Sequence, residues 1–208
     1  MTAKKEQPKL AEAATASDWV IEGMRTLAAV GIDGVKVERL AAGLGISKGP
    51  FYWRFSGRSE LLAAMLAMWK HEFTARRIEQ GVPLANPRAR METLMENVLV
   101  AKWRGTDVAR LEGAVRAWAA QDATAGRVVC EVDRLRVSYL VRELGLSGID
   151  APEAEMMAKG IYLALIGLYT TRQYTPELAD DAAFRSLVGV CLDQVDVAAA
   201  RTKVEARR

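Results

Sequence analysis

The chain has 208 residues, half of them apolar by type, so it can bury one large core or two smaller ones without covalent cross-links. Its 29 cationic and 26 acidic side chains give a net charge of +3, which by itself favours no class of charged partner. The two cysteines, Cys130 and Cys191, lie far apart without metal-ligand spacing, and the longest apolar run is about half of what a bilayer crossing requires. We therefore exclude a disulfide scaffold and a membrane span and, because the N-terminus shows no secretion signal, expect a cytoplasmic protein.

The N-terminus predicts a tail followed by an amphipathic helix. Residues 1–16 are small, polar and charged, and we expect them to be mobile. Ser17 or Asp18 can cap the helix that follows, in which apolar residues recur at helical spacing as far as Gly31.

Two short helices joined by a glycine-containing turn come next and form a helix-turn-helix. Apolar side chains at helical spacing over residues 37–44 predict the first of them. Ser47 can cap the second, whose first turn carries Gly49 and Pro50, where a missing side chain or N–H does least harm. The side chains expected to pack inward are Leu40, Ala41, Leu44, Ile46, Phe51 and Phe55. Those expected to face outward are Lys48, Gly49, Pro50, Tyr52, Trp53 and Arg54.

Exposed aromatic and cationic side chains gather on this motif. Tyr52 and its neighbour Trp53 point about 100° apart on a helix, so both cannot share the inward face that the phenylalanines fill. Between residues 36 and 58 the cations Lys36, Arg39, Lys48, Arg54 and Arg58 stand against one acid, Glu38. Such a concentration of positive charge predicts a face that binds a polyanion.

Beyond the motif the chain predicts a second, larger helical unit. A long helix is expected over residues 59–80. Asn86 can cap the next helix, with Pro87 at its first position, and this helix is expected to reach Trp103 and end before Gly105. Further helices are expected at residues 106–120, 126–145, 150–173 and 181–200. The helices then number about nine, and no strand is expected.

Few side chains are suited to catalysis or metal binding. His71 is the only histidine, so neither a Ser/His/Asp triad nor a metal site with several imidazoles is expected. No glycine-rich loop joins a strand to a helix, which disfavours nucleotide binding of the P-loop or Rossmann kind. Acidic pairs such as Asp180 and Asp181 lie at helix starts, where their negative charge interacts favourably with the helix dipole. We therefore expect no enzyme activity, no metal and no cofactor.

The segment "VERLAAGLGISKGPFYWRFSGRSELLAAML" resembles the DNA-binding domain of the TetR family of bacterial transcriptional regulators. The resemblance covers roughly residues 19–69 and is carried by the glycine turn and the aromatic core at 51–55; beyond it, the likeness is one of helix number and length. It implies an all-α fold with a three-helix helix-turn-helix domain over 17–60. A larger helical effector-binding and dimerisation domain would occupy 61–200, and a charged tail 201–208.

The resemblance also implies roles for the side chains of the motif. In the third helix, Lys48 would donate to guanine and Pro50 would touch a thymine methyl. Tyr52 and Arg58 would hold phosphates and set the register on the duplex. Arg54 replaces the family's usual histidine and can still donate to phosphate.

The start of the second helix departs from the family pattern. Many members have a threonine there that caps the helix, whereas this chain has Lys36, followed by Val37 and Glu38. Because Glu38 would repel DNA, base recognition is expected to rest mostly on the third helix. The residues expected to bind DNA are Lys36, Val37, Ser47, Lys48, Gly49, Pro50, Tyr52, Trp53, Arg54 and Arg58.

The function implied is that of a transcriptional regulator, most simply a repressor released from a near-palindromic operator by a small-molecule effector. The eighth and ninth expected helices, at residues 150–173 and 181–200, carry more apolar faces than one chain can bury. These surplus faces predict a homodimer formed through the two helices. The effector is expected to be mostly apolar, in a pocket lined by Met65, Trp69, Met95, Trp103, Trp118, Arg136 and Tyr139. Two alternatives remain: an all-helical small-molecule-binding protein or enzyme with an incidental basic surface, and a helical adaptor that contacts proteins through its last two helices.

Overall fold

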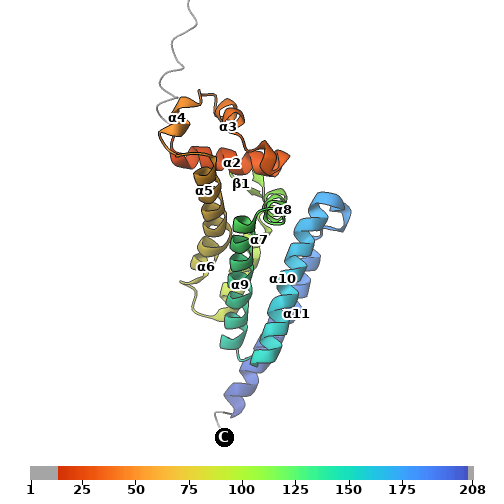
Figure 1. Ribbon diagram of the computed structural model, residues 1–208. Coiled ribbons are helices and arrows are strands. Elements are labelled where there is room, and N and C mark those ends of the chain that lie inside the picture. The colour runs from red at the N-terminus through yellow and green to blue at the C-terminus, as the bar shows by residue number, and fades with distance from the viewer. Residues whose placement is uncertain (1–13, 206–208) are drawn as a thin grey trace, which may run out of the picture. The chain divides into compact units, whose positions relative to one another are not determined.

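The computed structural model describes residues 14–205, with side chains through residue 193 (Figure 1). The all-α fold expected from the sequence is confirmed for this part of the chain, apart from two short strands. None of the helices described is long and apolar enough to span a membrane. Most of the expected mobile tail and the last residues of the charged tail lie outside the described residues.

The chain divides into two compact units. The first consists of the residues up to Lys70 together with Lys102–Val128. The second consists of His71–Ala101 together with the residues from Val129 onward. Each unit therefore combines segments that are distant in sequence.

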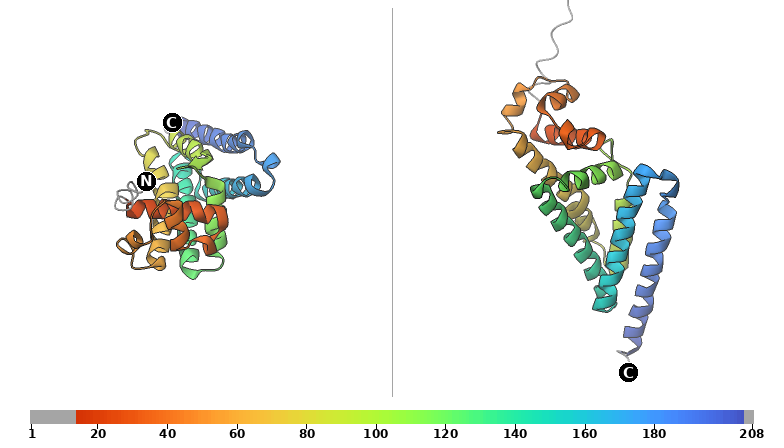
Figure 2. Two further views of the ribbon diagram at one scale, coloured as in Figure 1. Left: turned by 90° about the horizontal axis from the view of Figure 1, so that it is seen from above. Right: turned by 45° about the vertical axis from the view of Figure 1, so that its right-hand side comes forward.

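The first unit begins with the helices of the predicted motif. They are α2 (Ala16–Val30), the 3-10 turn η1 (Ile32–Gly34), α3 (Val37–Gly43), α4 (Gly49–Tyr52) and α5 (Arg58–Lys70). In both Figure 1 and Figure 2, α3 and α4 lie on one side of α2, and α8 (Val108–Ala119) lies on the other. Within this unit, α2 therefore lies between the α3–α4 pair and α8.

The cap of α2 differs from the prediction, because Thr15 holds that position rather than Ser17 or Asp18. The Thr15 hydroxyl accepts a hydrogen bond from the Asp18 N–H (3.3 Å), and the Asp18 carboxylate accepts one from the Thr15 N–H (2.8 Å). These reciprocal bonds satisfy donors that the first turn of a helix leaves free. The hydrogen bonds from Thr15 also lower the pKa of the Asp18 carboxyl.

The expectation that the chain contains no strand is wrong. A helix does not continue to Trp103; β1 (Lys102–Trp103) pairs with β2 (Thr106–Asp107) as an antiparallel hairpin instead. Both residues of the two-residue turn, Arg104 (φ 47°) and Gly105 (φ 80°), have the positive φ that a type I′ hairpin turn requires. Strands of two residues show no alternating pattern in a sequence, which is why this hairpin is not predicted.

The second half of the first unit packs through a buried carboxylate. Glu112 of α8 is almost fully buried, and one of its oxygens accepts a hydrogen bond from the indole N–H of Trp69 in α5 (3.2 Å). Arg116, one turn further along α8, forms an ion pair with the other oxygen (2.9 Å). These bonds compensate the cost of removing the charge from water and join α5 to α8.

The second unit consists of helices and helical turns. They are the π-helical turn η2 (His71–Ala75), α6 (Arg76–Gly81), α7 (Pro87–Leu99), α9 (Ala123–Leu146, which begins in the first unit), α10 (Ala151–Tyr174), the 3-10 turn η3 (Pro176–Leu178) and α11 (Asp181–Glu205). The predicted cap of α7 is confirmed, since the Asn86 side chain accepts from the Ala89 N–H (2.7 Å). Asp150, at the start of the helix predicted over residues 150–173, caps α10 by accepting from the Glu153 N–H (3.0 Å).

The long helix predicted over residues 59–80 is interrupted by η2. Arg136 of α9 holds this π-helical turn: its Nε donates to the hydroxyl of Thr74 (3.0 Å) and its second guanidinium nitrogen to the carbonyl of Phe73 (3.4 Å). A π-turn widens the helix and disturbs the regular ladder of backbone bonds, so a side chain that supplies donors stabilises it.

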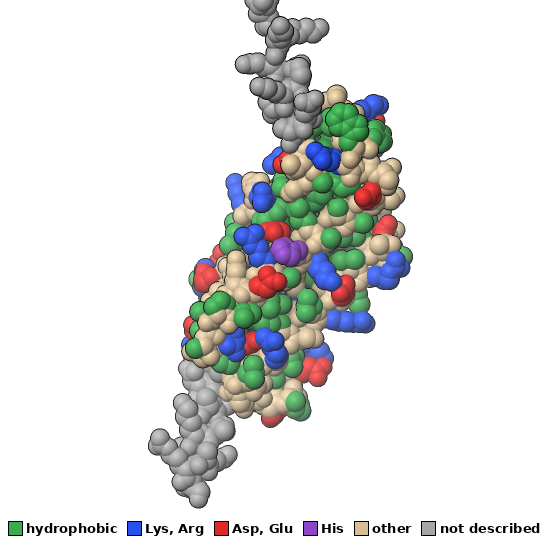
Figure 3. Space-filling view, turned by 90° about the vertical axis from the view of Figure 1, so that its left-hand side faces the viewer, with side chains coloured by type: hydrophobic (Ala, Val, Ile, Leu, Met, Phe, Trp, Pro, Cys, Tyr) green, Lys and Arg blue, Asp and Glu red, His purple; other side chains and the backbone are tan. Residues whose placement is uncertain are grey.

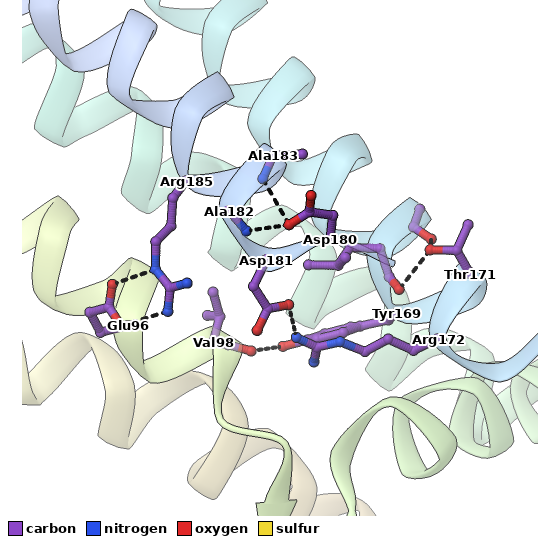
Figure 4. Close-up of polar contacts among 12 residues, drawn as sticks. Glu96, Val98, Tyr169, Thr171, Arg172, Asp180, Asp181, Ala182, Ala183 and Arg185 are labelled. Carbon is purple, nitrogen blue, oxygen red and sulfur yellow. Dashed lines mark hydrogen bonds and ion pairs between the residues drawn. The ribbon is translucent and has the colours of Figure 1, made fainter. Parts of the chain in front are cut away.

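The C-terminal end of α7 is held by both α10 and α11 (Figure 4). The Tyr169 hydroxyl of α10 donates to the carbonyl of Val98, one of the last carbonyls of α7, which no intrahelical donor satisfies. Arg185 of α11 donates to both carboxylate oxygens of Glu96 (2.9 and 3.0 Å). Together these bonds fix the position of the C-terminal end of α7, after which the chain continues into the hairpin.

Candidate nucleic-acid interface

Backbone hydrogen bonds fix the turn between α3 and α4. Gly45 lies in the left-handed region (φ 69°), where a residue with a Cβ would be strained. Its N–H donates to the carbonyl of Ala42 (3.1 Å), and the N–H of Ile46 donates to that of Ala41 (3.0 Å). The glycine therefore ends α3 and redirects the chain into the next helix.

Aromatic packing anchors the short α4. Phe51 is fully buried, and its ring meets Trp19 of α2 edge-on (5.2 Å between centroids) and stacks on Phe55 (5.3 Å). Leu40 and Ala41 of α3 are buried as well. The inward packing predicted for these residues is confirmed, whereas Leu44 and Ile46 are only half-buried.

The opposite face of α4 is open to solvent. Tyr52 is 58% exposed and Trp53 74% exposed, which confirms that neither shares the inward face with Phe51. Lys48, Gly49 and Arg54 are exposed too. Figure 3 shows cationic side chains beside exposed apolar ones at its upper end, over the part of the first unit that holds this motif.

Two expectations about α4 are wrong. Pro50 is buried rather than outward-facing, because the four-residue helix turns both Pro50 and Phe51 toward the core. Its burial removes the support for a contact with a thymine methyl. Ser47 does not cap the helix, since Lys48 occupies the capping position and no side chain accepts a bond there. Ser47 itself is exposed.

At the start of α3, Lys36 holds the capping position without a side-chain hydrogen bond, so the predicted loss of the cap is confirmed. Lys36 is exposed and Val37 is half-buried. The cation is therefore accessible to a phosphate, whereas the valine contributes to packing.

Arg58 has a structural role that the sequence did not reveal. Its Nε donates to the carbonyl of Val35 (2.8 Å) and its second guanidinium nitrogen to that of Ile32 (2.9 Å). These bonds tie the start of α5 to the turn that precedes α3. The residue as a whole is still exposed, so a phosphate could approach it at the helix N-terminus.

Glu38 and Lys48 form an ion pair that sequence reasoning also missed. The two charged groups lie 3.7 Å apart, one on the first turn of α3 and the other at the start of α4. The signal was present in the sequence, because Glu38 is the single acid among the cations of this segment. The pair places a negative charge beside the residue expected to read guanine.

The chain is similar to known proteins in both sequence and fold. Residues 22–65 match the family model described as bacterial regulatory proteins of the tetR family. The chain carries a TetR-family helix-turn-helix. In fold it is similar to a transcriptional regulator from Rhodococcus sp. Rha1, with 19% identity, 90% of this chain and 95% of that chain covered, and a TM-score of 0.69.

A TetR-family transcriptional regulator from Streptomyces coelicolor is also similar, with 15% identity, 92% of this chain and 96% of that chain covered, and a TM-score of 0.70. No curated protein matches the chain. The likeness extends over both units, so the TetR-like fold continues beyond the helix-turn-helix.

The seven residues expected to line an effector pocket are divided between the two units. Met65, Trp69, Trp103 and Trp118 lie in the same unit as the TetR-type helix-turn-helix, and Met95, Arg136 and Tyr139 lie in the other. Most are buried, although Trp103 is half-buried beneath the guanidinium of Arg104. Burial raises the pKa of Tyr139. The pocket itself stays a prediction.

Proposed function

We propose that the protein is a homodimeric repressor that binds a near-palindromic operator in the cytoplasm and is released from it by a small-molecule effector. The observation that carries the DNA-binding part is that α4 buries Phe51 completely, whereas Tyr52 and the cationic and aromatic residues that flank the helix are exposed. In a helix-turn-helix the second helix enters the major groove, and its N-terminal residues contact base edges.

The exposed side chains would share the work of recognition. Lys48, at the N-terminal end of α4, is suited to donate to guanine O6 and N7. Tyr52 and Arg54 can hydrogen-bond phosphates, and Lys36 and Arg58 add positive charge at the starts of α3 and α5. Trp53 contributes a large exposed ring beside them.

The proposed dimer uses α10 and α11, which pack against each other within the second unit. Along α10 the exposed residues Met156, Leu163 and Tyr174 alternate with exposed glycines at helical spacing, and Leu187 and Val190 are exposed on α11. A monomer gains nothing from so much apolar surface in water, whereas a two-fold symmetric copy would bury it. The glycines would let the two copies of α10 approach closely.

A charge placed on this face tests the dimer. Leu163 is 69% exposed, so Leu163→Glu should leave each protomer folded and prevent association because it would bury an unpaired carboxylate. Val82, exposed outside α10 and α11, gives the matched control Val82→Glu. Sedimentation at micromolar concentration should then find the wild type and the control dimeric and Leu163→Glu monomeric; a monomeric wild type would contradict the dimer.

The proposed release of DNA rests on the continuity of the chain from α5 into η2. Because α5 begins beside the helix-turn-helix and ends where the second unit starts, an effector held by the second unit can act on the position of α5. Linkage then requires DNA to weaken effector binding by the same factor by which the effector weakens DNA binding.

The experiment that tests DNA binding is retention of the protein on duplex DNA at several salt concentrations, followed by sequencing of fragments of the source genome that it selects. A repressor of this kind should be retained at low salt, released as salt rises, and enrich a two-fold symmetric sequence. Failure to bind duplex DNA at low salt would favour the alternative of a small-molecule-binding protein with an incidental basic surface.

A further inference from the structure

The ion pair between Glu38 and Lys48 bears on which bases the protein reads. The Glu38 carboxylate comes from the first turn of α3, and the Lys48 ammonium precedes the first residue of α4. The groups lie 3.7 Å apart, and their side chains are 70% and 61% exposed. A carboxylate therefore lies beside the N-terminal end of α4. In a helix-turn-helix, the residues at this end of the second helix contact base edges.

Stability does not explain this pair. Exposed ion pairs contribute little to folding, because water solvates both charges and two long side chains must lose freedom to meet. For the same reason the pair can turn toward a ligand at little cost. Both groups are thus available to a duplex that approaches α4.

The major-groove edge of a G·C base pair matches the two charges. Guanine offers the acceptors O6 and N7, and cytosine offers the N4–H₂ donor directly beside them. A cation next to an anion is complementary to acceptors next to a donor. At a T·A pair with thymine under the carboxylate, Glu38 would face the O4 acceptor and would lose its water without gaining a partner.

We propose that Glu38 and Lys48 together read one G·C base pair in each half-site, with Lys48 donating to guanine and Glu38 accepting from N4 of cytosine. This inference rests on the proposed DNA-binding function and makes Glu38 a specificity-determining residue. The repulsion between Glu38 and the phosphates acts on every sequence alike, so it lowers non-specific binding. The same carboxylate then raises discrimination in two ways.

The test is selection from a randomised duplex library, together with affinities for the selected and a random duplex at several salt concentrations. Glu38→Ala should bind random duplex more tightly than the wild type and lose about fivefold or more of its preference for cytosine at one position. Glu38→Gln should shift that preference toward adenine, because an amide pairs with adenine N6 and N7.

The matched control is Asp33→Ala, which removes an exposed negative charge from η1 of the same unit. It should raise affinity for all duplexes alike and leave the preference unchanged. Because the two side chains contact different bases of the pair, Lys48→Met combined with Glu38→Ala should lose more preference at that base pair than either single substitution.

Two results would overturn the proposal, and they are distinguishable. If Glu38→Ala and Asp33→Ala both raise affinity uniformly and neither changes the selected sequence, Glu38 reads no base, and the proposed function stands. If the wild type does not bind duplex DNA at low salt, or selects no sequence, the proposed function fails and the inference with it.

Discussion

Phe51 and Tyr52 are adjacent aromatic residues of one four-residue helix, and the structure predicts opposite consequences for their removal. Phe51 is fully buried and its ring lies between 5.2 and 5.3 Å from those of Trp19, Tyr52 and Phe55. Removing a buried phenylalanine leaves a cavity, so Phe51→Ala should lower the free energy of unfolding of the first unit by about 3–5 kcal/mol. That is a fifth or more of the roughly 5–15 kcal/mol that stabilises a typical domain.

Tyr52→Ala is the matched control, because its ring is largely exposed and contributes one edge-on contact. The cost should stay below about 1 kcal/mol, although duplex binding should weaken. The assay follows from the positions of the tryptophans: Trp19, Trp53, Trp69, Trp103 and Trp118 all lie in the first unit. Tryptophan fluorescence during urea unfolding therefore reports that unit alone. Equal costs for the two variants, or a larger one for Tyr52→Ala, would refute the assignment of inward and outward faces.

Three further changes test particular contacts. Arg136→Met removes donors from Thr74 and the Phe73 carbonyl and should destabilise the second unit by about 1–3 kcal/mol; urea unfolding followed by circular dichroism should shift more than the tryptophan signal. Since the Thr15 hydrogen bonds lower the pKa of Asp18 from 3.8 in the folded state, its contribution is present above about pH 4 and lost as pH falls through the folded value. The stability difference between wild type and Asp18→Asn should accordingly shrink in acid; a constant gap would contradict the cap. Arg104→Gly should stabilise the first unit by about 0.5–1 kcal/mol by relieving a positive φ, whereas Lys102→Gly in the paired strand should destabilise it, both read from the fluorescence midpoint.

Local signals in the sequence predicted two helix caps and the exposed side chains of the helix-turn-helix. The caps Asn86 and Asp150 were predictable because a capping side chain and the N–H it accepts from are three residues apart. The exposure of Tyr52 and Trp53 was predictable because helical geometry does not allow both to lie on the inward face that Phe51 fills. Thr15 was missed, although the same kind of signal was present, because it stands inside a polar stretch expected to be a tail.

What the sequence could not show depends on contacts between distant residues. The bonds of Arg58 to the carbonyls of Ile32 and Val35 have no pattern in sequence, since any residue offers a carbonyl. The burial of Pro50 depends on how a four-residue helix is oriented by its neighbours. The assignment of α8 to the first unit follows from its packing on α2, many residues earlier.

The π-helical turn at His71–Ala75 has a consequence for chain length. A π-turn accommodates one more residue than the α-helical turn it replaces, so the side chains before and after it follow two different helical phases. Deleting one residue within this turn should restore a continuous α-helix from α5 to α6 without unfolding either. An insertion or deletion elsewhere in that helix would instead rotate every later side chain by about 100°. In this chain, therefore, η2 is the place in that helix where the loss of one residue is expected to be tolerated.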